Sequence, residues 1–200
     1  MMGYDEQILG KMREESRCPV CALLEDLEFE ILSQLQYNVT EDEAVRNAIA
    51  KAGGFCDFHF RRFRKLANDR TNALLLLALI REYCERSEGI AIRCQVCEDI
   101  ASYEAWLLKA LNSMLHGNDF REQYEQVTGL CICHMQEVQH ATDSAAERVW
   151  LQSCQIRQMR DSIPSLQQMV ERSYFETTLN QRRTIPGSVE KFVGRKSVGL

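Results

Sequence analysis

Four short cysteine and histidine pairs recur at matched spacings, and they constrain this chain more than any other feature. Two are Cys-x-x-Cys pairs that lie 76 residues apart, and two are Cys-x-x-His pairs that lie 75 residues apart. Their residues, in chain order, are Cys18, Cys21, Cys56, His59, Cys94, Cys97, Cys131 and His134. A doubled spacing of this kind indicates an internal repeat of a metal-ligand set.

The spacing predicts two metal sites, each with three cysteines and one histidine. Taking the pairs in order along the chain, we expect the first site to contain Cys18, Cys21, Cys56 and His59. The second is then expected to contain Cys94, Cys97, Cys131 and His134. Thiolate sulfur and imidazole nitrogen suit zinc in a closed tetrahedral site, so two zinc ions are the predicted cofactors.

Other chemistries compete for the same residues. Three cysteines and a histidine can also hold an iron–sulfur cluster, although the usual bacterial cluster motif has its cysteines closer together. A Cys-x-x-Cys pair such as Cys18 and Cys21 also occurs in thioredoxin-like redox proteins, but there it follows a strand in a βαβ unit. A single pair is also compatible with two plain buried thiols. The presence of two matched sets favours metal binding.

Composition limits the class of protein. The chain is 45% hydrophobic and 26% charged, with a net charge of −5, which is ordinary for a soluble protein and gives no overall basic field for nucleic acid. The longest apolar run, Ala73 to Ile80, is too short to cross a membrane, and no signal peptide is expected. Nine cysteines in such a chain favour metal or redox roles over disulfides, so we expect a cytoplasmic protein.

Hydrophobic periodicity predicts an all-α fold, because no segment alternates with the two-residue period of a strand. Both Cys-x-x-Cys pairs are expected to enter a helix at the second cysteine. Capping boxes are predicted at Thr40 with Glu43 and at Asp119 with Glu122. Pro164 is expected to break the last helical region or to open a new helix that continues to about residue 179. The predicted helices cover residues 5–16, 23–35, a short segment from the Thr40 capping box to about 51, 56–66, 71–87, 97–115, 143–160 and 164–179, and a further helix start is predicted at Asp119.

The repeat predicts a helical protein built from two similar metal-pinned halves with further helices after them. The expected divisions are a first metal-binding repeat over residues 1–90 and a second repeat core over 91–142. Helices over 143–180 are expected to pack on the repeats, and a basic tail covers 181–200. That tail is interpreted as a terminal segment lying across the helices, with a basic arm for a partner as the alternative.

A mixed aromatic and basic run, Phe58 to Lys65, raises the question of nucleic-acid binding. The run has a simpler explanation as an amphipathic helix with a phenylalanine face and a solvated basic face. The corresponding segment of the second copy, Cys133 to Gln139, lacks the basic residues. Nucleic acid is therefore not the expected partner.

The pattern Cys-Pro-x-Cys, followed about 37 residues later by Gly-Phe-Cys-x-x-His, resembles an uncharacterised prokaryotic family defined by a domain of unknown function. The resemblance covers residues from about 15 to 140. It implies an α-helical protein in which the two sets predicted above are the characteristic residues. The second copy departs from the pattern at Gln95 and Leu130, neither of which is a candidate ligand.

These observations predict a cytoplasmic helical protein with two structural zinc sites that acts as a binding or interaction module with a protein partner. The alternative is an iron–sulfur or thiol-based protein that transfers electrons or senses oxidants. A metal-assisted hydrolase is disfavoured, because four protein ligands leave no open position on the ion. The chain also lacks a His-Glu-x-x-His motif, a phosphate loop and a nucleophile elbow.

Overall fold

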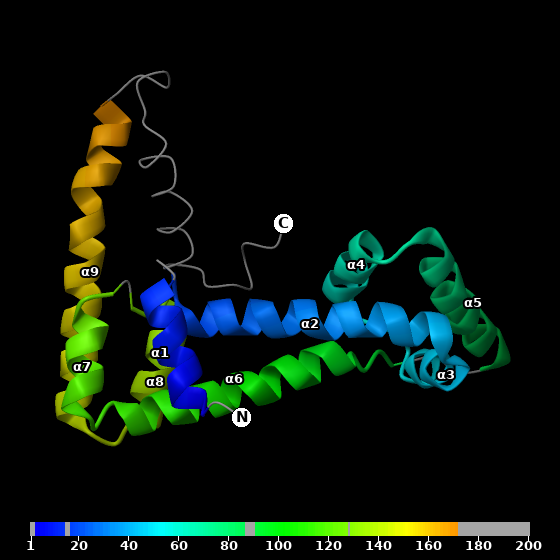
Figure 1. The fold of residues 1–200 in the computed structure, drawn as a ribbon, viewed down its shortest axis with the longest axis horizontal. Coiled ribbons are helices and arrows are strands. Elements are labelled where there is room, and N and C mark those ends of the chain that lie inside the picture. The colour runs from blue at the N-terminus through cyan, green and yellow to red at the C-terminus, as the bar shows by residue number, and fades with distance from the viewer. Residues whose placement is uncertain (1–2, 15–16, 87–90, 128, 172–200) are drawn as a thin grey trace. The chain divides into compact units, whose positions relative to one another are not determined.

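The computed structural model describes residues 3–14, 17–86, 91–127 and 129–171. Within these ranges the chain forms nine helices and no strand (Figure 1). The predicted all-α class is confirmed. The helices are α1 (Tyr4–Glu14), α2 (Pro19–Glu41), α3 (Glu43–Lys51), α4 (Asp57–Leu66), α5 (Asp69–Glu85), α6 (Gln95–Met114), α7 (Asn118–Glu125), α8 (Ile132–Ala141) and α9 (Ala145–Glu171).

Among the described residues, none of the helices combines the length and apolar character needed to cross a membrane. The basic tail predicted for 181–200 lies outside the described residues, as does the end of the helix predicted to reach residue 179.

The chain divides into two compact units that are not contiguous in sequence. Unit 1 contains the chain up to Glu25 and from Glu104 onward, and unit 2 contains Asp26–Tyr103. The boundaries fall inside α2 and α6, so each of these long helices contributes residues to both units. This division differs from the contiguous one expected from the repeat, with boundaries near residues 90 and 142.

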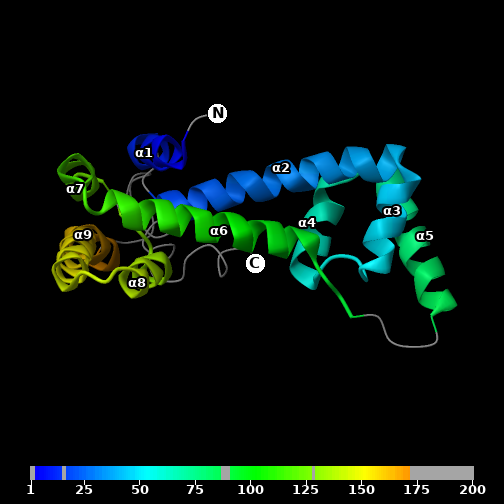
Figure 2. The same cartoon turned by 90° about the horizontal axis from the view of Figure 1, so that it is seen from below.

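Unit 1 packs α1, α7, α8 and α9 with the first turns of α2 and the last part of α6. Its core includes the fully buried side chains of Ile8, Leu111 and Tyr124. Helices α8 and α9 pack against each other, as Figure 2 also shows. The Tyr124 hydroxyl accepts a hydrogen bond from the backbone N–H of Leu130 at 3.2 Å, which ties α7 to the segment that leads into α8.

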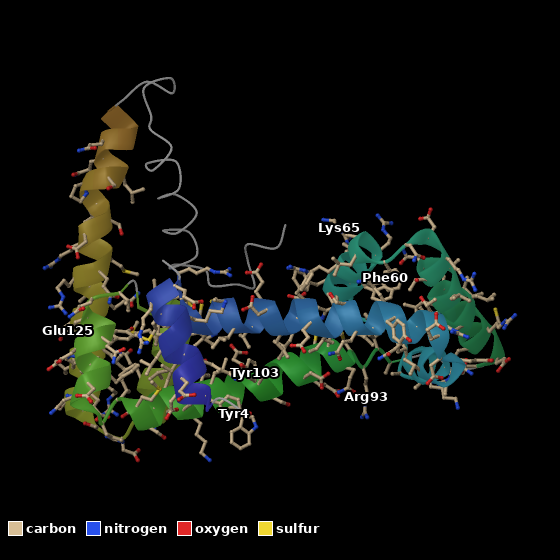
Figure 3. All side chains as sticks on the ribbon, in the orientation of Figure 1. Tyr4, Phe60, Lys65, Arg93, Tyr103 and Glu125 are labelled. Atoms are coloured by element: carbon tan, nitrogen blue, oxygen red, sulfur yellow. The ribbon has the colours of Figure 1, made fainter. Side chains whose placement is uncertain are left out.

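Unit 2 packs α3 and α5 against each other (Figure 1), together with α4 and most of α2. The buried side chains of Leu32, Phe63 and Leu75 form its core. On α4, Phe63 is fully buried whereas Arg64 and Lys65 are exposed, and Lys65 points outward (Figure 3). This pattern is that of an amphipathic helix with an apolar inner face and a solvated basic face.

Glycines turn the chain just before each Cys-x-x-His helix. Gly54 has φ of 86° and Gly129 has φ of 75°, values that residues with a Cβ rarely adopt. Space is also limited, since a Cβ on Gly129 would lie 2.2 Å from the side-chain oxygen of Gln158. The Gln158 amide is itself held, donating to the carbonyls of Tyr124 and Val127. Both glycines therefore turn the chain just ahead of a Cys-x-x-His pair.

Both predicted capping boxes are wrong. Helix α3 is capped by Asp42, whose side chain accepts from the N–H of Ala44, while the Thr40 hydroxyl bonds the carbonyl of Gln36. Helix α7 begins after Gly117, two residues earlier than expected, so Asp119 lies in its first turn rather than at its cap.

The break expected at Pro164 is also wrong. Helix α9 runs through Pro164 to Glu171 without interruption. Proline has no N–H to donate, so the helix lacks one hydrogen bond at this position, and the proline ring crowds the preceding turn.

A buried carboxylate organises the start of α9 in unit 1. Glu147 accepts from the Thr142 hydroxyl at 2.8 Å, and its other oxygen lies 3.1 Å from the Arg121 guanidinium and 2.8 Å from Nδ1 of His116. Burial alone would raise the pKa of Glu147, but the Thr142 hydrogen bond and the positive charges of His116 and Arg121 lower it below its usual value.

We therefore expect Glu147→Gln to destabilise unit 1 by about 1–3 kcal/mol at pH 7. A lowered folded-state pKa stabilises the fold above the ordinary glutamate pKa of about 4.3, and this contribution disappears as the pH falls below it. The difference in unfolding free energy between Glu147→Gln and the parent protein should therefore shrink as the pH falls. Urea unfolding followed by tryptophan fluorescence measures it, because both tryptophans, Trp106 and Trp150, lie in unit 1. An equal difference at pH 3.5 and pH 7 would contradict this account.

Candidate metal sites

The eight predicted ligands stand at the N-termini of four helices. The backbone carbonyls of Cys18, Cys56, Cys94 and Cys131 each accept the first hydrogen bond of the helix that follows. The partner ligand of each pair lies three residues further on, in the first turn. Helix N-termini carry partial positive charge and stabilise thiolates. The helices α2 and α6 thus begin directly after the first cysteine, two residues before the second cysteine at which they were expected to begin.

In unit 1 the side chains of Cys18, Cys21, Cys131 and His134 converge. The Nδ1 atom of His134 lies 3.4 Å from Sγ of Cys18, 3.4 Å from Sγ of Cys21 and 3.2 Å from Sγ of Cys131. The two sulfurs of Cys21 and Cys131 are 3.8 Å apart. All four residues are buried. We call this group the unit 1 quartet.

In unit 2 the side chains of Cys56, His59, Cys94 and Cys97 converge in the same way and form the unit 2 quartet. Here Nδ1 of His59 lies 3.3 Å from Sγ of Cys56, 3.4 Å from Sγ of Cys94 and 3.2 Å from Sγ of Cys97. The sulfurs of Cys56 and Cys97 are 3.6 Å apart. In each quartet the donor atoms all lie within 4.8 Å of one another.

The predicted grouping of the ligands is wrong, although every predicted ligand lies in one of the two quartets. The Cys-x-x-Cys pair of the first copy lies with the Cys-x-x-His pair of the second copy. The Cys-x-x-Cys pair of the second copy lies with the Cys-x-x-His pair of the first. Sequence spacing cannot separate these arrangements, because Cys94 lies 38 residues after Cys56 and 37 before Cys131. Closing the longer loop from Cys21 to Cys131 costs only about 1 kcal/mol more than a loop of 37 residues.

The length of α2 explains why Cys18 and Cys56 do not meet. A helix of 23 residues is about 34 Å long. Only 14 residues separate its end from Cys56, and 9 of them form α3, which rises about 13 Å. The chain would have to be almost fully extended to return to Cys18, whereas it turns at Gly53 and Gly54.

The distances between the ligand atoms of each quartet are those expected around one tetrahedrally coordinated ion. With Zn–S distances of about 2.3 Å and Zn–N distances of about 2.0–2.1 Å, tetrahedral geometry places sulfurs about 3.8 Å apart and sulfur and nitrogen about 3.5 Å apart. The observed separations of 3.6–3.8 Å and 3.2–3.4 Å match these edges. Both quartets can therefore hold a metal ion.

A buried or partly buried glutamate contacts the second ring nitrogen, Nε2, of each histidine. Nε2 of His134 lies 2.9 Å from Oε1 of Glu104, and Nε2 of His59 lies 3.5 Å from Oε1 of Glu28. A carboxylate at Nε2 fixes the ring so that Nδ1 points at the ion, and loss of such a partner typically weakens metal binding about 10–100-fold.

Sequence reasoning missed both glutamates, although a signal was present. Each follows the first cysteine of its Cys-x-x-Cys pair by ten residues, Glu28 after Cys18 and Glu104 after Cys94. The helix that begins at one quartet therefore carries the carboxylate for the histidine of the other.

Burial and neighbouring groups set the protonation of the metal-free quartets. Burial raises the pKa of the Cys18 thiol well above its usual value, and hydrogen bonds with Cys131 and Cys21 raise it further. Hydrogen bonds from Cys18 and Cys21 hold the pKa of Cys131 far below its usual value. Burial alone would lower the pKa of His134, but contacts with Cys131, Cys21 and Glu104 outweigh it and raise the pKa to about 12.

In unit 2, desolvation and the neighbouring thiols of Cys56 and Cys94 raise the pKa of Cys97 to about 12. Burial and the positive charge of Arg62 lower the pKa of His59, which favours the neutral imidazole that binds metals. Arg62 lies 3.2 Å from Glu28, whose side chain is almost completely buried.

The remaining cysteines lie outside the quartets. Cys84 and Cys133 are exposed and Cys154 is buried, and all nine cysteines are free thiols in this structure. Cys133 follows Cys131 by two residues but is not a member of the unit 1 quartet.

The described chain is thus an all-α protein with two quartets of three cysteines and one histidine, each able to hold a metal ion. Residues 7–92 match the model of a family described as a family of unknown function, DUF6062. The similarity to an uncharacterised family is confirmed over that segment, which includes Cys18, Cys21, Cys56 and His59 and so contains half of each quartet. No curated protein and no protein of known structure gives a significant match to the chain.

The observed grouping, in which each quartet takes one pair from each copy, makes a specific prediction about metal stoichiometry. His134→Ala should remove one of two ions per chain, and adding Cys18→Ala should remove no further ion because both residues serve the unit 1 quartet. Combining His134→Ala with Cys94→Ala should remove both ions. Elemental analysis after dialysis against a weak chelator measures the content. Loss of both ions in the Cys18 and His134 pair, with only one lost in the Cys94 and His134 pair, would restore the sequential grouping.

Proposed function

We propose that this protein is a helical interaction module whose two quartets each hold one structural zinc ion. The observation that carries the proposal is that three sulfurs and one Nδ1 atom lie within 4.8 Å of one another in each of the two quartets, with Nδ1 3.2–3.4 Å from every sulfur. Each histidine in addition contacts a carboxylate through its other nitrogen, an arrangement typical of metal-binding histidines. A free-thiol chemistry would not require the ring nitrogen to lie within 3.4 Å of all three sulfurs.

The distances favour single ions over iron–sulfur clusters. The ligands of a cluster bind different iron atoms that are separated by bridging sulfides, so their donor atoms spread apart. Here all four donors of each quartet lie within 4.8 Å of one another. Thiolate-rich tetrahedral sites that bind one ion suit zinc, which has no redox chemistry of its own.

The proposed role of the ions is structural because four protein ligands saturate tetrahedral zinc. In unit 1 the ion would join the start of α2 to the start of α8, and in unit 2 the start of α4 to the start of α6. The thiolates supply more negative charge than the ion neutralises, and the converging helix N-termini offset the excess. Structural zinc contributes about 10–16 kcal/mol of apparent binding free energy in small domains, which is comparable to the stability of a whole domain.

We also propose that the two halves are an internal repeat. Several structural features recur at the same offset as the ligands. Arg46 donates to the carbonyl of Thr40 as Arg121 does to that of Leu115, six residues back in both cases. The side chain of Asn68 caps α5 at the N–H of Thr71, and that of Ser144 bonds the N–H of Glu147 at the start of α9.

A surface on α2 in unit 2 supports a protein partner. Phe29 is 60% exposed and Tyr37 is 70% exposed. Both line a shallow groove with the polar residues Glu30, Ser33, Gln34 and Asn38. Exposed aromatic side chains within a polar rim are typical of protein interfaces. The free thiols suit a reducing compartment, so we propose a cytoplasmic location.

The zinc proposal predicts about two zinc ions per chain in protein purified without added metal. X-ray absorption at the zinc edge should give about three sulfur ligands at about 2.3 Å and one nitrogen at about 2.0–2.1 Å. Removal with a strong chelator should lower the unfolding free energy by several kcal/mol, because loop closure and helix docking are lost. A brown protein with broad absorption and iron in place of zinc would support the redox alternative instead.

The partner proposal predicts that Phe29→Ser with Tyr37→Ser abolishes capture of a specific protein by cross-linking in the source cells. Val149→Ser is the matched control, because Val149 is 63% exposed but lies in unit 1. Zinc content and circular dichroism should be unchanged in both variants, since none of the three residues is buried. Equal capture by the double variant and the parent would contradict a partner site on α2.

A further inference from the structure

The two quartets have the same donor atoms but differ in their access to solvent. In unit 1, Cys18 is 2% exposed, Cys21 is 5% exposed and Cys131 is completely buried. In unit 2, Cys97 is exposed, Cys56 is half-buried and only Cys94 is buried among the cysteines. Cys97 of the unit 2 quartet is therefore open to solvent and to a small water-soluble reagent, whereas the three cysteines of the unit 1 quartet are enclosed.

Proximity of the sulfurs does not distinguish the quartets. The sulfurs of Cys56 and Cys97 in unit 2 are 3.6 Å apart, and those of Cys21 and Cys131 in unit 1 are 3.8 Å apart. Each pair needs only a small movement to reach a disulfide length of about 2.05 Å. Solvent access is therefore the feature that separates the two sites chemically.

We propose that the unit 2 quartet is a site of reversible oxidation by peroxides, at which Cys97 reacts first, forms a disulfide with Cys56 and releases the ion. This inference rests on the proposed zinc sites. The unit 1 quartet keeps its ion under the same conditions. The protein would thus combine one permanent structural ion with one that responds to oxidants.

The chemistry is balanced with hydrogen peroxide as the oxidant. The Cys97 thiolate attacks one peroxide oxygen, the O–O bond breaks, and a sulfenic acid and a hydroxide ion form. The Cys56 thiolate then attacks the sulfenic sulfur, the S–S bond forms, the S–O bond breaks, and a second hydroxide leaves. The two thiolates lose two electrons and the peroxide gains them. A dithiol reductant reverses the step by thiol–disulfide exchange.

The geometry predicts that oxidation does not unfold unit 2. The ion loses two of its four ligands, and Cys94 and His59 alone hold zinc poorly. Cys56 precedes α4 and Cys97 lies in the first turn of α6, so the disulfide joins the same two helix starts that the ion joined. The covalent link therefore replaces the metal link.

The test is a peroxide titration of the full zinc-loaded chain carrying Cys84→Ser and Cys133→Ser, which removes the exposed cysteines outside the quartets. A chromogenic chelator follows released zinc, and alkylation with peptide mass spectrometry maps the disulfides. We expect one zinc per chain to leave at least tenfold faster than the other, together with a Cys56–Cys97 link. The tryptophan fluorescence of unit 1 should stay constant during this phase.

Simultaneous release of both ions, or a first disulfide among Cys18, Cys21 and Cys131, would overturn the inference while leaving the structural zinc sites intact. A chain that binds no zinc would contradict the proposed function instead. In that case faster alkylation of Cys97 than of Cys131, and a Cys56–Cys97 link on mild oxidation, still support the difference in access. Equal alkylation of both would refute it.

Discussion

The structure depends on the convergence of four helix N-termini in two pairs. Each helix start presents two donor atoms three residues apart, and each pair of starts presents four. Helices α2 and α6 each begin at one quartet and supply the glutamate that contacts the histidine of the other.

The two quartets show how environment separates sites of equal composition. The same three sulfurs and one nitrogen are enclosed in unit 1 and partly open in unit 2. The histidines differ as well, since Glu104 contacts His134 at 2.9 Å whereas Glu28 lies 3.5 Å from His59 and is shared with Arg62. Ligand identity thus sets which ions a quartet can hold, and burial sets which reagents can reach its ligands.

Much of the local structure was predictable because it depends on neighbouring residues. The helical class, the glycine turns before Cys56 and Cys131 and the amphipathic α4 all follow from short-range patterns. The errors arose where several local solutions compete. Asp42 caps α3 in place of Thr40, and α9 continues through Pro164 although proline cannot donate one of the helical hydrogen bonds.

The sequence by itself determined the eight candidate ligands and the all-α class, because both rest on residue type and spacing. It did not determine which ligands share an ion, since Cys94 is almost equally distant along the chain from Cys56 and from Cys131. Only the tertiary structure decided that grouping, through the stiffness of a 23-residue helix that carries the chain away from Cys18 before the first Cys-x-x-His pair is reached. It also decided that Cys97 is exposed and Cys131 is buried, because solvent access depends on packing between segments far apart in sequence.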